Sequence, residues 1–433
     1  TPRGLPPGGR VQTVEPSPHR PGGAYVAVLR YLLGDFRPYA YRTNDYGRTW
    51  TRIADGGNGI PKGEPVRVVR EDPSRPGLLY AGTEFGMYVS FDDGAHWQPF
   101  QQNLPHTPVT DIKVHRQDLV LSTQGRGFWI MDDLAPLHQL ADSVAAARAF
   151  LFRPREAVRA RWAGGFGGPE SGIVRPDAPQ YPPAGAMIDY RLADRPAGEV
   201  RLDVLDAAGR VVRSFSSDSA RANLPPERAG TAVLPRTPGM HRFVWDLAWP
   251  GPWDAGRGNG RNGPAAVPGT YRVRLTVGDW SATRPLVVRI DPRIAREGVT
   301  QADLEAQLAH NLRVRDLVTE VNRLVARVAE AKRTATGDAL ARLNALEATL
   351  VTPPVRYSRP GLQAQIQYLY GLGTQADQRM GRDAAERYQT LRRELNLAQI
   401  QAREILGPEP AGWNPSPAPV PAPSGDDDDD DNG

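Results

Sequence analysis

Two octapeptides in the first hundred residues repeat one pattern 47 positions apart. Thr43-Asn-Asp-Tyr-Gly-Arg-Thr-Trp50 is matched by Ser90-Phe-Asp-Asp-Gly-Ala-His-Trp97. Both place a hydroxyl residue, an aspartate, a glycine and a tryptophan at the same positions. A period of about 40–50 residues is typical of the four-stranded blades of β-propellers. The repeat therefore predicts stacked four-stranded sheets joined by one recurring turn.

The composition of the octet suits a tight turn between two strands. The aspartate can accept hydrogen bonds from turn amides, and the hydroxyl residue can bond to the same turn. The glycine supplies a positive φ, and the tryptophan can fill space between neighbouring sheets. We expect structural rather than catalytic roles for all eight residues, which are Thr43, Asp45, Gly47, Trp50, Ser90, Asp92, Gly94 and Trp97.

Residues 1–148 contain further short strand patterns separated by Gly, Pro, Asn and Asp. At about 47 residues per blade, this region provides about three blades, whereas closed propellers need ~4–8. We therefore expect an incomplete propeller, completed by preceding blades of a longer protein or by a partner chain. The chain would then be a carboxy-terminal portion of that protein.

The octets resemble the Asp-box, or BNR repeat, of sialidases, sortilin-like receptors and xyloglucanase-type glycoside hydrolases. The stretches Gly82–Gly86 and Gly125–Asp133 are similar to the last blades of large bacterial BNR or sortilin-type glycosyl hydrolases. His96 stands where the family usually has Thr, a change that leaves the turn chemistry intact. The resemblance covers most of the chain and implies an extracytoplasmic protein, periplasmic or secreted.

Residues 149–292 alternate apolar and polar side chains in a second series of strands. Their spacing predicts a small β-sandwich of about seven strands. The segments Asp203–Arg213, His241–Asp246 and Pro268–Leu275 resemble the Ig-like module of flagellar hook-cap proteins.

Residues 293–407 change to a helical period, with Leu and Val recurring every three to five positions from Leu304 to Val328. Thr300 and Asp303 form a capping pair, and further helices are predicted over Gly337–Leu350, Gly361–Met380 and Arg382–Ile405. Short joins favour an antiparallel bundle.

Residues 408–433 contain six consecutive aspartates and predict a disordered acidic tail, whose carboxylates we expect to be solvated rather than calcium-bound. The predicted fold is multidomain and mainly β.

Glu84 is the candidate catalytic residue if the chain is an enzyme. Glycoside hydrolysis usually needs two carboxyl groups across the scissile bond, and Asp132 and Asp133 are the other carboxylates near propeller motifs. The alternative is that Glu84 bonds turn amides or pairs with an arginine.

Three further residues are candidate ligand contacts. Arg126, beside Phe128 and Trp129, could hold an anionic or sugar ligand, although the favoured role of these aromatics is packing between blades. Trp249 and Trp253 flank a Pro-Gly-Pro turn on a long loop, where flat rings can stack on sugars. The alternative is that both rings fold back onto the sandwich.

Several function classes are disfavoured. The chain has no cysteine, which excludes disulfides and thiolate chemistry, and its seven histidines show no metal-ligand spacing. No nucleophile elbow, zincin motif or phosphate-binding loop occurs, and we expect no cofactor. A net charge of +4 with scattered Lys and Arg argues against nucleic-acid binding, and no apolar run is long enough for a membrane span.

Three functions remain open. The first is binding of a polysaccharide or protein ligand by the carboxy-terminal portion of an exported Asp-box propeller. The second is a BNR-type glycoside hydrolase whose paired carboxylates lie mostly on blades outside this chain. The third is a structural or assembly module.

Overall fold

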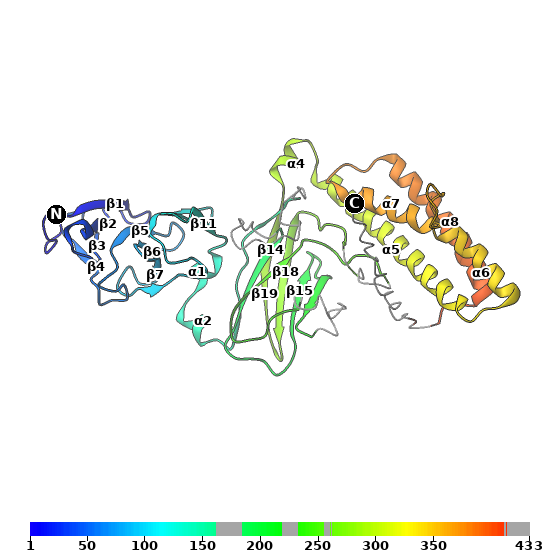
Figure 1. The fold of residues 1–433 in the computed structure, drawn as a ribbon, viewed down its shortest axis with the longest axis horizontal. Coiled ribbons are helices and arrows are strands. Elements are labelled where there is room, and N and C mark those ends of the chain that lie inside the picture. The colour runs from blue at the N-terminus through cyan, green and yellow to red at the C-terminus, as the bar shows by residue number, and fades with distance from the viewer. Residues whose placement is uncertain (162–183, 219–232, 255–259, 261, 411–412, 414–433) are drawn as a thin grey trace, which may run out of the picture. The chain divides into compact units, whose positions relative to one another are not determined.

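The computed structural model describes residues 1–161, 184–218, 233–254, 260, 262–410 and 413 (Figure 1). Its chain divides into two compact units, Thr1–Ala145 and Ala146–Gly433. The fold is mainly β with a helical part near the carboxyl end, which confirms the predicted class at that level. The aspartates 426–431 and most of the glycine-rich run 256–263 lie outside the described residues.

The first unit contains three antiparallel sheets that follow one another in the chain. The first has the order β1-β2-β3-β4, the second β5-β6-β7-β8 and the third β9-β10-β11. A short 3-10 helix, Tyr31–Leu33, joins β2 to β3. The strands are β1 (Arg10–Pro16), β2 (Ala24–Leu29), β3 (Ala40–Thr43), β4 (Thr51–Ala54), β5 (Val66–Glu71), β6 (Leu79–Thr83), β7 (Met87–Ser90), β8 (Gln98–Pro99), β9 (Val109–His115), β10 (Asp118–Thr123) and β11 (Phe128–Met131).

Apolar side chains close the seam between each pair of successive sheets. One buried cluster joins the first and second sheets, with Ile53 and Ala54 packed beside Val66 and Trp97. A second cluster joins the second and third sheets. Most of the core of this unit therefore lies between sheets, as stacking of blades requires, and a smaller buried cluster lies on the outer face of the first sheet.

The third sheet differs from the other two because helix α1 (Ala135–Gln139) stands where a fourth strand would follow β11. Asp133 accepts a hydrogen bond from the amide of Ala135 at 3.0 Å and so begins the helix. His138 Nε2 lies 2.9 Å from Asp72 Oδ2, which ties α1 to the second sheet. A second short helix, α2 (Asp142–Ala146), ends the unit.

The second unit begins with two sheets that enclose one apolar core (Figure 1). One has the order β12-β14-β17 and the other the order β13-β19-β18-β15-β16, with β13 parallel to β19. Trp245 and Tyr190 are the largest side chains of this core, both fully buried. The strands are β12 (Ala149–Leu151), β13 (Ala157–Arg159), β14 (Ala186–Leu192), β15 (Val200–Leu205), β16 (Val211–Ser216), β17 (Gly239–Trp245), β18 (Gly269–Val277) and β19 (Trp280–Ile290).

The helical part packs Leu and Val stripes of four helices into one core. A reciprocal capping box begins α5, since the Asp303 amide donates to Thr300 Oγ1 at 3.2 Å and the Thr300 amide donates to Asp303 Oδ2 at 3.0 Å. The helices are α4 (Pro292–Arg296), α5 (Gln301–Lys332), α6 (Gly337–Leu350), α7 (Leu362–Gln375) and α8 (Arg382–Leu406). Within the described ranges, none of the helices has the length and apolar character needed to cross a bilayer.

Helix α7 ends at Gln375, five residues before the predicted end at Met380. Ala376 has an extended backbone, and its carbonyl accepts a hydrogen bond from Gln307 Nε2 at 2.6 Å. The next residue, Asp377, bonds through Oδ1 to Arg159 Nη2 of β13 at 2.7 Å. Contacts with α5 and with the sandwich therefore stop the helix, and the helical period of the sequence does not reveal them.

The Arg159–Asp377 ion pair holds the sandwich against the helical part. Both side chains are nearly buried, with exposed fractions of 5% and 2%. Arg161 Nε contacts the same carboxylate oxygen at 2.8 Å. A buried ion pair is strongly coupled to folding, because removal of one partner leaves a buried charge without compensation.

We predict that Asp377→Asn lowers the free energy of unfolding of the second unit by about 3–5 kcal/mol, because Arg159 would keep its charge in the interior. Urea unfolding followed by circular dichroism measures the change. Glu156→Gln is the matched control, since it breaks an Arg289–Glu156 pair that is open to solvent and should leave stability nearly unchanged. Equal losses in the two variants would contradict the assigned role of Asp377.

Candidate functional site

The two octets form the same turn. In the first, Thr43 Oγ1 accepts a hydrogen bond from the Gly47 amide at 2.9 Å, and in the second Ser90 Oγ accepts from Gly94 at 2.9 Å. Asp45 Oδ1 likewise accepts from the Thr49 amide at 2.8 Å. Both glycines have positive φ, +84° and +87°. Each carboxylate is thus committed to its own turn.

His96 takes the place of Thr49 without loss of the turn. Thr49 Oγ1 donates to Asp45 Oδ2 at 2.6 Å, and His96 Nδ1 lies 2.6 Å from Asp92 Oδ2. The side-chain hydrogen bond from Thr49, followed by the backbone bond, lowers the pKa of Asp45 to about 2. These bonds favour the charged form of the carboxylate, so Asp45 is a hydrogen-bond acceptor and is poorly suited to donate a proton.

The two tryptophans of the octets differ in what covers them. Trp97 is 4% exposed, and its Nε1 donates to the carbonyl of Ile53 in the preceding sheet at 2.6 Å. Trp50 is half-buried, and its Nε1 donates within its own turn, to Gly47 O at 3.0 Å. The same residue therefore closes a seam between two sheets in one repeat, whereas in the other it is partly exposed and packs against a buried cluster of its own sheet.

Glu84 is held in a bidentate ion pair. Arg67 Nε contacts Oε1 at 2.9 Å and Nη2 contacts Oε2 at 3.0 Å. Only 16% of the Glu84 side chain and 12% of the Arg67 side chain are exposed. This is the geometry of the arginine pairing that the sequence left open as an alternative, and Asp133 serves to begin α1. The carboxylates nearest the propeller motifs thus have structural partners.

Arg126 lies on the exposed turn before the edge strand β11. Its carbonyl accepts a hydrogen bond from Trp129 Nε1 at 3.0 Å, and the Trp129 ring packs against the core of the second and third sheets. Phe128, on the opposite face of the strand, is 82% exposed. Of the two aromatics beside Arg126, Trp129 therefore packs against the core and Phe128 is accessible to solvent.

The two loop tryptophans of the sandwich are not the exposed rings that sugar stacking would require. Trp249 is half-buried and packs against the sandwich core. Trp253 is fixed to α5, because its amide donates to Thr319 Oγ1 at 3.0 Å and its carbonyl accepts from Asn322 Nδ2 at 2.9 Å. The Arg323 guanidinium lies 5.5 Å from the centre of the Trp253 ring. The loop thus docks onto the helices, which the local sequence could not show.

Sequence reasoning also missed a polar network in the first seam. Asp93 Oδ1 accepts from Tyr25 Oη at 2.6 Å and from Arg20 Nη2 at 3.1 Å, and Arg42 also bonds to this carboxylate. Burial, followed by the hydrogen bond to Asp93, raises the pKa of Tyr25 far above its usual range. The network joins the first two sheets, and its acids and bases are already paired with one another.

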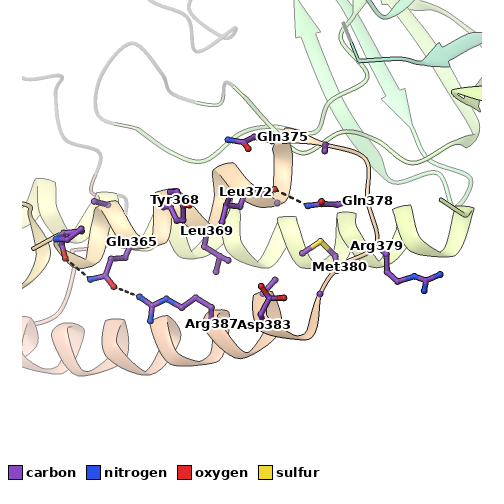
Figure 2. A pocket seen from close by; sticks show the side chains of 16 residues that line it. Gln365, Tyr368, Leu369, Leu372, Gln375, Gln378, Arg379, Met380, Asp383 and Arg387 are labelled. Atoms are coloured by element: carbon purple, nitrogen blue, oxygen red, sulfur yellow. Dashed lines mark hydrogen bonds between the residues drawn. The ribbon is translucent and has the colours of Figure 1, made fainter. Parts of the chain in front are cut away.

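A groove lies between α7 and α8 (Figure 2). Its volume of about 860 Å³ is within the range of small-ligand sites. Leu369, Leu372 and Met380 give it an apolar floor, and Tyr368 at its edge is 69% exposed. Arg387 at its rim bonds to Gln365. The groove can accept apolar groups, but it lacks the facing carboxyl groups of a glycosidase site.

The described part of the chain contains no group of three or more His, Asp or Glu side chains arranged to hold a metal ion. The six aspartates of the tail are not among the described residues.

No protein-family model matches the sequence, and a search of curated proteins gives no match either. Among solved structures, an ancestral GH74 enzyme is 17% identical, with 28% of this chain and 14% of that one covered and a TM-score of 0.22. PorZ, a surface component of the type-IX secretion system of Porphyromonas gingivalis, is 11% identical, with 64% of this chain and 30% of that one covered and a TM-score of 0.23. A GH74 enzyme of Niastella koreensis is 11% identical, with 64% of this chain and 46% of that one covered and a TM-score of 0.24.

This chain spans less than half the length of each of these three structures. At such TM-scores, its function has to be inferred from its own residues.

We predict that Trp97→Ala lowers the free energy of unfolding of the first unit by about 3–5 kcal/mol, because the ring fills the seam between two sheets. Trp50→Ala should cost clearly less, because part of that ring already faces solvent. Urea unfolding together with hydrogen exchange in β4 and β7 measures both. A loss in Trp50→Ala as large as in Trp97→Ala would contradict the difference in burial between the two rings.

We also predict that the carboxyl group of Asp45 titrates with a pKa of about 2. Its folded pKa lies below the unfolded value of about 3.9, so the contribution of Asp45 to stability is present above pH 4 and is lost as the pH falls toward 2. Carboxyl-detected NMR over pH 1.5–6 measures the pKa, and Thr49→Ala should raise it. A pKa near 3.9 in the unmodified chain would contradict the turn geometry.

Proposed function

We propose that this chain is a non-catalytic assembly part of an extracytoplasmic β-propeller protein. In this proposal, the outer face of the β1–β4 sheet, on the side away from the second sheet, binds a further four-stranded sheet at Trp50, supplied by the same or another polypeptide. The observation that carries the proposal is the difference between Trp97, which is buried in a seam between two sheets, and Trp50, its equivalent in the first repeat, which is partly exposed. The Asp-box resemblance of the octets supports the extracytoplasmic location.

The composition of the outer face supports a sheet as its neighbour. Val26, Val28, Tyr39 and Tyr41 form a buried apolar cluster there, and Leu5 and the partly exposed Trp50 pack against it. The covered seam uses the same arrangement, with alanine, valine and tyrosine of neighbouring strands packed around Trp97. Because sheets pack through such apolar faces, the repeat predicts that the first sheet receives a neighbour as the second one does.

The paired carboxylates argue for a non-catalytic role. A glycosidase needs one carboxyl group that is able to donate a proton and a second that acts as base or nucleophile. Glu84 instead holds Arg67 through both oxygens, and Asp45 and Asp92 are bound by their turns. Glu84, Asp45 and Asp92 are therefore poorly suited to serve as the acid and base pair of a glycosidase.

The partner that binds at Trp50 can be identified by photo-crosslinking. A benzophenone amino acid at position 50 of the full chain, expressed in its native host, should crosslink to a segment of strand-rich sequence. The same group at position 357, an exposed tyrosine of the second unit, is the control for nonspecific capture. Absence of any crosslink at position 50, or crosslinks only within the present chain, would refute the proposal.

Catalysis is tested in parallel on soluble polysaccharides, with reducing-end release and binding measured on the same samples. We expect no turnover, and no difference between the unmodified chain and Glu84→Gln. Turnover that is abolished in Glu84→Gln but retained in Glu156→Gln, a carboxylate of the second unit, would instead establish a glycoside hydrolase.

A further inference from the structure

A small cavity lies where the sandwich meets the helical part, and its walls carry an unusual arrangement of charge. Its volume is about 190 Å³, equal to about six water molecules at ~30 Å³ each. Small residues beside β13 and β14 and in the connection from β17 to β18 form most of the wall, and Arg159, Arg161 and Asp246 are its charged members. The cavity therefore has the size of a small organic acid or an inorganic oxyanion.

Two arginines of this cavity share one oxygen atom. Arg159 Nη2 and Arg161 Nε both contact Asp377 Oδ1, at 2.7 and 2.8 Å. One carboxylate thus compensates two guanidinium groups, and the pair keeps an excess positive charge. Since Arg159 is 95% buried, that charge lies in a medium where electrostatic interactions are stronger than in water.

Arg159 also lacks partners for part of its guanidinium. Within the described residues, its Nε and Nη1 atoms are buried without a hydrogen-bond acceptor. Buried donors normally have a partner, because a buried donor without one loses the hydrogen bonds that it makes to water in the unfolded chain. Burial lowers the pKa of Arg159 in spite of the nearby Asp377, which is the direction expected for a cation with too little compensating charge.

Arg161 provides the accessible part of the site. Its side chain is 37% exposed, and one of its nitrogens donates to the Thr374 carbonyl at the cavity wall. Asp246 also lines the cavity, but it is exposed and its Oδ1 accepts from the Ala248 amide at 3.1 Å. Solvent therefore screens the repulsion between the Asp246 carboxylate and a bound anion, whereas the charge of the buried Arg159 is screened much less.

We propose that this cavity binds a small oxyanion, the carboxylate of a sugar acid or an inorganic sulfate, against Arg161 with Arg159 behind it. Planar guanidinium groups are suited to such ligands, since they donate parallel hydrogen bonds to two oxygens. The site belongs to the second unit and does not depend on the proposed assembly of the first.

Titration calorimetry of the full chain tests the proposal with sodium glucuronate, sodium sulfate and neutral glucose at constant ionic strength. We expect saturable binding of glucuronate and none of glucose. Binding of sulfate as well would identify an inorganic oxyanion as sufficient, and binding of glucuronate alone would assign the site to a carboxylate-bearing sugar. Absence of saturable binding of both anions at millimolar concentration would overturn the proposal.

Three variants test the charges. Arg161→Gln should weaken the affinity at least tenfold, because it removes a charge-assisted hydrogen bond. Asp246→Asn should strengthen it several-fold, because it removes an opposing charge. Arg289→Gln, which removes a solvent-exposed arginine of β19, should leave it unchanged. Ala248→Phe fills the cavity without changing its charge and should abolish binding, with circular dichroism to verify folding. Equal weakening in Arg161→Gln and Arg289→Gln would show a nonspecific charge effect and overturn the site.

Discussion

The order of the first unit depends on how an indole ring joins one sheet to the next. Trp97 stands directly before β8, an edge strand of the second sheet. Its Nε1 nevertheless donates a hydrogen bond to the carbonyl of Ile53 in the first sheet. The octet turn fixes this ring, since Ser90 and Asp92 hold the backbone that carries it. A short local motif thereby controls a long-range contact, and the stacking of the sheets depends on it.

Much of this arrangement could be predicted from the octets, because their chemistry is local. An aspartate, a glycine and a hydroxyl residue at fixed spacing specify a turn whatever surrounds them. The helical period likewise indicated α5 and its capping box, both of which depend on neighbouring residues. The end of α7 and the docking of Trp253 could not be predicted, because they are decided by Arg159 and Thr319, which lie far away in the sequence.

The candidate site residues show the same division. Glu84 was singled out by its position at a strand end, but its role is decided by Arg67 on the neighbouring strand. A sequence shows which side chains can carry charge, whereas the pairing of those charges depends on strand register. The buried Arg159–Asp377 pair, separated by 218 residues, has no local signal of any kind.

Among the described residues, the third sheet has no fourth strand, and β11 has one unpaired edge. An unpaired edge can template the addition of strands from other molecules and so promote aggregation, above all where apolar side chains such as Phe128 and Ile130 are exposed. β11 is only four residues long and offers few hydrogen bonds to an incoming strand. The shortness of β11 therefore limits aggregation through its edge, and a longer β11 would lower the solubility of the protein.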